Sequence, residues 1–314
     1  MRYDIELSIR NRYPHCADHA RYLLRLCPRD LDPRQTVSAA DVTVTPVPAE
    51  RREFVDFFGN RVLEIAYASS ESEVRMDLKA QVERRGLAVP PDSSPMLSDL
   101  PAQISAVDSL AAEAPHHFLG ASARVAPHPQ FQRYAQAHSA PDRSVLDGAI
   151  AIGRALHRDM RFDPEATTVD TPALEAFSQR HGVCQDYAHI MIGALRSIGI
   201  PAGYVSGFLR TNPPPGKPRL EGADAMHAWV QFWCGLQMGW IEYDPTNAMY
   251  ADVDHVVIAR GRDYSDVSPI KGALRSAGEQ HSEQRVTVRP LEPGHEEGGA
   301  TGQGARGTGH GKST

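Results

Sequence analysis

The chain has 314 residues, of which 41% are hydrophobic and 23% are charged. This length suits one large domain or two ordinary ones, and the composition is typical of a globular protein with a packed core. The formal net charge of −6 excludes a strongly basic nucleic-acid or membrane surface, and no apolar run is long enough for a membrane-spanning helix. We therefore predict neither a nucleic-acid partner nor a membrane partner.

The first residues and the cysteines predict a cytoplasmic protein. Residues 1–10 alternate and carry charges where a secretory signal would have an apolar stretch. The four cysteines, Cys16, Cys27, Cys184 and Cys234, are scattered and form no CxxC pair, which is typical of free thiols in a reducing cytosol. We predict no cofactor and no resident metal, and we make no prediction of oligomeric state.

Residues 1–85 predict an accessory domain built from β-strands. Strand-like alternation places Tyr3, Ile5, Leu7 and Ile9 on one face, and a turn is expected at residues 57–61. Successive strands without helical periodicity between them are typical of an antiparallel sandwich. The predicted strands cover residues 2–10, 21–26, 36–45, 53–67 and 72–83.

Residues 86–141 are richer in proline, alanine and serine and predict a connector with one or two short helices. His116 and His117 suggest a metal site at first sight. Adjacent side chains diverge, however, and no cysteine or acidic cluster accompanies them. We therefore interpret this segment as a connector.

Residues 142–289 mix helical and strand patterns and predict an α+β core. An amphipathic helix is expected over residues 142–160, capped by Asp142 or Ser144, and a short helix ends at Gln179. A loop rich in proline and glycine, residues 210–222, is expected at the surface. The predicted strands cover residues 203–209, 226–234, 240–243, 253–258 and 285–288.

Residues 290–314 are rich in glycine, lack apolar residues to bury, and predict a disordered tail. The last residues, GTGHGKST, resemble a phosphate-binding loop in part. Arg306 stands where that loop requires its first glycine, and no strand precedes the segment. We therefore predict no nucleotide site.

Residues 181–201, HGVCQDYAHIMIGALRSIGIP, predict a buried helix that begins after Gly182 and ends at Gly199 and Pro201. Cys184 then lies in the first turn. There the unpaired backbone N–H groups and the positive end of the helix dipole favour a thiolate over a thiol. The alternative is a small core residue, which is the commoner role of a cysteine in an apolar stripe.

Two predicted strands supply partners for this cysteine. His227 opens one strand and Asp244 closes the next, and a turn at residues 234–239 would place the two side by side. In a Cys–His–acid site the thiolate attacks a carbonyl, the imidazolium protonates the leaving group, and the carboxylate orients the ring. Two alternatives stay open: Asp244 also begins a turn sequence, and the three side chains are of types that bind zinc.

Three segments, GVCQDYAH, MHAWVQFW and GWIEYDPTNA, resemble the signature segments of the transglutaminase-like superfamily, in that family's order. RSIGIPAGYVSGFL and ARGRDYSDVSPIKG resemble its bacterial branch of transglutaminase-like cysteine proteases. Residues 3–83 resemble the N-terminal domain of that branch. The resemblance implies a papain-like, transglutaminase-like core, in which the nucleophile helix packs on an antiparallel sheet, preceded by a β-sandwich-like domain.

The resemblance also implies the catalytic roles. Cys184 would be the nucleophile, His227 the general acid and base, and Asp244 the orienting acid. We expect the backbone N–H of Cys184 to bind an oxyanion, with Gln179 or Gln185 as a second donor. Gly203 stands where arginine is common in relatives, which bears on substrate contacts and not on the triad. The residues predicted to contact substrate are Gln185, Trp229 and Trp240, although core packing is the alternative for both tryptophans.

We therefore predict a cysteine-dependent hydrolase or acyltransferase that acts on peptide-like amides through a thioester at Cys184. Peptidase or amidase activity is favoured over protein crosslinking. The resemblance does not imply calcium dependence, because the sequence shows no oxygen-rich loop. The alternative function is an inactive scaffold that binds peptides in the same groove, which turnover of an amide library would separate from an enzyme.

Overall fold

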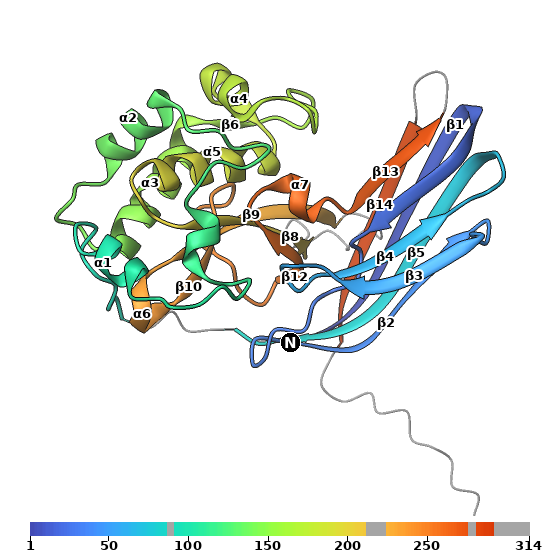
Figure 1. Ribbon diagram of the computed structural model, residues 1–314, viewed down its shortest axis with the longest axis horizontal. Helices are drawn as coiled ribbons and strands as arrows, with labels where there is room; N and C mark the ends of the chain where they lie inside the picture. The colour runs from blue at the N-terminus through green and yellow to red at the C-terminus, as the bar shows by residue number, and fades with distance from the viewer. Residues whose placement is uncertain (87–90, 212–223, 276–280, 292–314) are drawn as a thin grey trace, which may run out of the picture.

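The structure is a computed structural model that describes residues 1–86, 91–211, 224–275 and 281–291, without the side chains of residues 15–18 and 275. Long strands form one end of the molecule, and helices gathered around a second sheet form the other (Figure 1). None of the described helices is both long enough and apolar enough to span a membrane.

The long strands form a seven-stranded sheet in the order β2-β5-β1-β4-β3, with β13 and β14 also paired to β1. The first half of β1 lies between β5 and β14, and the second half lies between β4 and β13. All of these pairings are antiparallel. The strands are β1 (Arg2–Leu24), β2 (Gln35–Thr45), β3 (Glu50–Val55), β4 (Arg61–Ala66), β5 (Glu71–Arg84), β13 (Ile270–Arg275) and β14 (His281–Leu291).

The two halves of this sheet face each other, as the prediction of a β-sandwich-like domain requires. The hydroxyls of Tyr13 and Tyr22 lie 2.6 Å apart in the core, and Arg51 of β3 donates to the carbonyl of Val42 in β2. The predicted strands 2–10 and 21–26 are parts of one strand, β1, which bends between them. His19, at φ 50°, lies in this bend.

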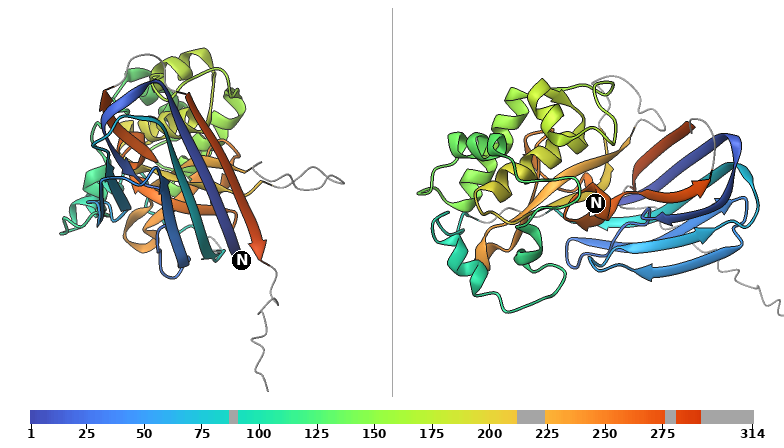
Figure 2. Two further views of the ribbon diagram at one scale, coloured as in Figure 1. Left: turned by 90° about the vertical axis from the view of Figure 1, so that its right-hand side faces the viewer. Right: turned by 45° about the horizontal axis from the view of Figure 1, so that its top comes forward.

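Strands β13 and β14 correct the predicted domain boundary. The sequence analysis assigned them to the core of residues 142–289 and assigned Pro290 to the tail, but the structure adds both strands to the N-terminal sheet. Val286 and Val288 are buried opposite Leu7 and Ile5 of β1. Figure 2 shows β14 running beside β1. The predicted surface loop at 210–222 and the predicted tail lie almost entirely outside the described residues.

The connector contains three short helical segments, where one or two were predicted. The rings of His116 and His117 approach the backbone carbonyls of Val107 and Leu110. The segments are α1 (Leu100–Ser105), η1 (Pro115–Phe118) and α2 (Pro129–His138).

The second sheet has five antiparallel strands in the order β11-β10-β9-β8-β12, with helix α5 packed against β8 and β9. Helices lie over this face of the sheet (Figure 2). The predicted α+β core, with the helix that begins at Cys184 packed on an antiparallel sheet, is confirmed. The strands are β8 (Ala202–Leu209), β9 (Ala225–Trp233), β10 (Trp240–Asp244), β11 (Met249–Tyr250) and β12 (His255–Gly261).

Helix boundaries in the core follow the expected local signals. Ser144 caps α3 by accepting a hydrogen bond from the backbone N–H of Asp147, and Gly199 adopts φ 85° after α5. The remaining elements are α3 (Val145–Asp159), β6 (Arg161–Phe162), α4 (Ala173–Gln179), β7 (His181–Gly182), α5 (Cys184–Ser197), α6 (Gly235–Met238) and α7 (Tyr264–Val267).

Two side-chain amides join the N-terminal sheet to the outer edge of β12. Gln35 donates to the carbonyl of Val257 (2.7 Å) and accepts from its N–H (2.8 Å), and Asn60 makes the same pair of bonds with Arg260 (2.8 Å each). Each amide therefore binds the edge strand as a neighbouring backbone would. These bonds satisfy backbone groups that an edge strand otherwise leaves unpaired.

Candidate active site

Cys184 is the first residue of α5, and its side chain is partly buried. Asp186 folds back over the helix start, where its carboxylate accepts from the backbone N–H of Val183 (2.8 Å) and the hydroxyl of Thr167 (2.6 Å). Gly182 permits this approach, because a Cβ there would lie 2.5 Å from Oδ2 of Asp186. Asp186 thus holds the helix start, which is the structural role that its first-turn position suggests.

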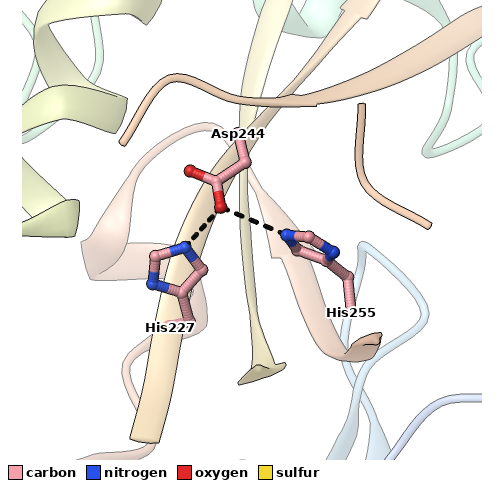
Figure 3. A group of neighbouring side chains, drawn as sticks. All are labelled: His227, Asp244 and His255. Atoms are coloured by element: carbon pink, nitrogen blue, oxygen red, sulfur yellow. Dashed lines mark hydrogen bonds and ion pairs between the residues drawn. The ribbon is translucent and has the colours of Figure 1, made fainter. Parts of the chain in front are cut away.

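His227 and Asp244 lie on the neighbouring strands β9 and β10, and their side chains meet. Nε2 of His227 lies 2.7 Å from Oδ2 of Asp244 (Figure 3). The Asp244 side chain has no exposed surface and that of His227 is 9% exposed. The antiparallel pairing of the two strands therefore produces the contact expected from the chain order.

Cys184, at the start of α5, lies near enough to His227 to affect the pKa of the imidazole. Because Nε2 of the imidazole bonds Asp244, Nδ1 is the nitrogen left for the thiol. Burial lowers the pKa of His227, but hydrogen bonds and charge interactions with Asp244 and Cys184 outweigh this effect and raise the pKa to about 10. The imidazole is therefore protonated at neutral pH, between a carboxylate and a sulfur.

The carboxylate of Asp244 accepts five hydrogen bonds. Oδ1 receives the backbone N–H groups of Thr246 (2.9 Å) and Asn247 (3.2 Å). Oδ2 receives His227, the Asn247 side-chain amide (2.7 Å) and Nε2 of His255 (3.1 Å). Burial raises the pKa of Asp244, but these bonds and the charge of His227 hold it well below its usual range. The turn that begins at Asp244 therefore supplies donors that keep the acid ionised.

His255 was not singled out from the sequence, although it is the first residue of β12, and His227 lies near the start of β9. A histidine at a strand start is by itself a weak signal, because nothing local shows which side chain it meets. Its Nε2, Nε2 of His227 and Oδ2 of Asp244 lie within 4.8 Å of one another, so these three residues are of the type and spacing that could hold a metal ion.

The structure corrects the predicted role of Trp229. Its side chain is fully buried, its indole N–H donates to Glu242 (2.8 Å), and its ring packs edge-on against His255. Trp229 lies on the same face of β9 as His227 but under the site, so it cannot wall a substrate groove. The alternative of core packing is the correct interpretation for this residue.

The other predicted contacts are engaged with the connector and the nearby loops. The side-chain amide of Gln185, which is almost fully buried, donates to the backbone carbonyl of Val169 (3.2 Å). The indole N–H of Trp240 donates to the backbone carbonyl of Glu113 (2.8 Å). The exposed side chain of Gln179 bonds Glu175. Substrate contacts of Gln185 and Trp240, and an oxyanion role for the N–H of Cys184, stay predictions.

Gly207 makes room for Trp229 directly opposite His227 in the β8–β9 ladder. An added Cβ would lie 2.3 Å from both the Trp229 ring and the carbonyl oxygen of Val256. We expect Gly207→Ala to lower the free energy of unfolding by about 1–3 kcal/mol, because the strand and the ring must move apart. Urea denaturation measures this loss.

A matched control for this substitution is Gly120→Ala, since a Cβ at Gly120 would meet no atom within 4 Å and its φ is not positive. The control should change the free energy of unfolding by less than about 0.5 kcal/mol. Equal urea midpoints for the Gly207→Ala and Gly120→Ala variants would contradict the close packing against Trp229.

The cysteines with described side chains are expected to differ in reactivity. Burial raises the pKa of both Cys27 and Cys234, and Cys234 has no exposed surface. Cys184 is only partly buried and lies at the start of α5, beside His227. At pH 7 we expect iodoacetamide to label Cys184 at least about tenfold faster than the other two. Peptide mass mapping over time checks this, and similar slow labelling of all three would contradict it.

Two separate parts of the chain match known protein families. Residues 132–245 match the transglutaminase-like superfamily, and residues 3–83 match the bacterial transglutaminase-like N-terminal region. An uncharacterized protein of Mycobacterium leprae is 33% identical over 258 residues, which cover 81% of this chain and 86% of that protein. A protein-glutamine gamma-glutamyltransferase of Pseudomonas aeruginosa is 36% identical over 120 residues, 35% of this chain and 16% of that protein.

The chain spans about half the length of other curated mycobacterial relatives that it matches. A crystal structure of a protein from Cytophaga hutchinsonii covers 93% of both chains with a TM-score of 0.68 at 20% sequence identity, which shows the shared fold. The superfamily match includes Cys184, His227 and Asp244. The chain therefore belongs to the transglutaminase-like superfamily and carries the bacterial transglutaminase-like N-terminal region.

Proposed function

We propose that the protein cleaves peptide-like amides through a thioester at Cys184, with water as the acceptor of the acyl group. The observation that carries this proposal is the His227 imidazole, which lies 2.7 Å from Asp244 and whose pKa is raised by interactions with both Asp244 and Cys184. A protonated ring between a thiolate and a carboxylate is suited to acyl transfer.

The proposed reaction has two steps. In the first, the Cys184 thiolate attacks the amide carbon, the backbone N–H of Cys184 stabilises the oxyanion, and Nδ1 of His227 gives its proton to the amine as the C–N bond breaks. In the second, neutral His227 takes a proton from water, which attacks the thioester and releases the acid. The sulfur leaves as the thiolate, and His227 has regained its proton. Asp244 holds the ring throughout.

The name of the Pseudomonas relative suggests the first donor and the competing acceptor. That protein is a protein-glutamine gamma-glutamyltransferase, so a glutamine side-chain amide is the first donor to test and an amine is the second acceptor. We also propose that peptidase or amidase activity predominates over crosslinking. The proposal further includes a cytoplasmic location and an accessory role for residues 1–85.

Mass spectrometry of a trapped acyl-enzyme tests the proposal. The protein is incubated with a glutamine-containing peptide library and quenched in acid, and the adduct is mapped after digestion. We expect the acyl group on the peptide that contains Cys184, with ammonia or an amine released in equal amount. Adding a primary amine separates the acceptors, because a transferase would form the new amide. Binding of peptides without adduct or turnover would instead support the inactive scaffold.

Turnover is expected to persist through neutral pH and to fall as the pH rises through about 10. The pKa of His227 is raised from its ordinary 6.5 to about 10, so the imidazolium that protonates the leaving group is present below that value and lost above it. A profile of kcat/KM from pH 6 to 11, with circular dichroism at each pH to exclude unfolding, measures this. A fall centred near pH 6.5 would contradict it.

A further inference from the structure

His255 is a buried histidine beside the proposed triad. Its side chain is 1% exposed, and it stands at the first position of β12, a strand that contributes none of the three triad residues. Its ring lies on the other side of the Asp244 carboxylate from His227 (Figure 3). Asp244 is therefore bound by two imidazoles through the same oxygen, Oδ2.

The hydrogen bonds of His255 define which ring nitrogen carries the proton. Nδ1 accepts the backbone N–H of Asp252 (3.3 Å), so Nε2 must carry the proton and donates it to Oδ2 of Asp244 (3.1 Å). In this arrangement His255 is a donor to the carboxylate and has no free nitrogen with which to take up or release a substrate proton. Its contribution to a reaction would act through Asp244.

The ring of His255 is itself held in place from behind. Trp229 packs edge-on against it, with ring centroids 5.1 Å apart and planes at 80°. The indole N–H of Trp229 donates to Glu242, which also binds Arg260 and lies 3.8 Å from Arg84 of the N-terminal sheet. Ring packing and buried ion pairs thus support the orientation of His255 from two parts of the chain.

We propose that His255 is a positioning residue, which holds Oδ2 of Asp244 in line with Nε2 of His227. This inference rests on the proposed function, because it assigns His255 a part in orienting the proposed acid and base. Two backbone N–H groups fix Oδ1, whereas side chains alone hold Oδ2. Loss of the His255 bond would let the carboxylate turn and would misplace the imidazole relative to the sulfur, and such misplacements slow reactions strongly.

Two substitutions separate the two hydrogen bonds of His255. In His255→Gln the side-chain N–H reaches about as far as Nε2 and keeps the bond to Asp244. In His255→Asn the shorter amide can keep the bond from Asp252 but cannot reach Asp244. We expect His255→Asn to lower kcat about 10- to 100-fold with KM unchanged within about twofold, and His255→Gln to stay within about threefold of the unsubstituted protein.

A second readout does not depend on the substrate. The rate at which iodoacetamide alkylates Cys184 at pH 7 reports the contact of the sulfur with His227, and we expect His255→Asn to lower it while His255→Gln preserves it. In proton NMR spectra the far-downfield signal of the His227 Nε2–H should persist in the Gln variant and broaden or shift in the Asn variant. Thermal melting of all three proteins shows whether they are folded.

The outcomes distinguish the two proposals. Equal kcat and equal alkylation rates in both variants would overturn the positioning role. Equal decreases of kcat and of the alkylation rate in both variants, together with lower melting temperatures, would also overturn it and would show a packing role instead. If the unsubstituted protein cleaves no amide, the proposed function fails by itself. In that case the alkylation rates and the NMR signal still decide whether His255 orients Asp244 and His227.

Discussion

Replacing Cys184 by alanine is expected to abolish amide turnover while leaving the fold intact. The substitution removes the sulfur that would form the thioester, and such losses lower kcat by about 10⁴-fold or more. Cys184 is only partly buried and lies at the edge of the core, so the free energy of unfolding should change by less than about 1 kcal/mol. Steady-state kinetics and urea denaturation of the same preparation measure the two quantities.

The matched control for this prediction is Cys27→Ala, another partly buried cysteine, located in the N-terminal sheet region. Its turnover should equal that of the unsubstituted protein. Residual activity of Cys184→Ala above about one part in a thousand would show that another group performs the chemistry. Loss of activity together with loss of the cooperative urea transition would instead assign Cys184 to the core.

Replacing Asp244 by asparagine is expected to lower kcat by about 10³- to 10⁴-fold, because the ring of His227 loses the charge that orients and stabilises its protonated form. The structure also predicts a cost in stability. Asp244 accepts hydrogen bonds at both oxygens, whereas asparagine has one acceptor and one donor group.

Neither orientation of an asparagine side chain satisfies this site. With its NH₂ at the position of Oδ1, that group faces the backbone N–H groups of Thr246 and Asn247. With its NH₂ at the position of Oδ2, it faces His227, His255 and the Asn247 amide. We therefore expect the free energy of unfolding to fall by about 1–3 kcal/mol, since buried donors lose their acceptor.

Asp56→Asn is a control for the general effect of this substitution. Asp56 also accepts several hydrogen bonds, from Asn60 and Arg25, but it belongs to the N-terminal sheet region. Urea denaturation should show a loss of stability in both variants, whereas kcat should fall only for Asp244→Asn. A kcat within about tenfold of the unsubstituted protein would contradict the orienting role of Asp244.

Much of this protein follows from local patterns in its sequence. Alternating apolar residues predict most of the strands of both sheets, and helical spacing with its glycine and proline signals predicts α3 and α5. These patterns work because burial of one face has a period of two in strands and of 3.6 in helices. The order of Cys184, His227 and Asp244, each with its flanking residues, was sufficient to indicate the family and the candidate chemistry.

The tertiary structure alone decided which elements meet. The sequence predicts a strand at residues 285–288 but not that this strand pairs with β1. It also places Trp229 on the same face of its strand as His227, but it does not show that Trp229 is buried beneath the site and packs against His255. His255 gives no local signal of its bond to Asp244. Periodicity reports which side of an element is buried, whereas its partner across a sheet depends on contacts between distant residues that no local pattern encodes.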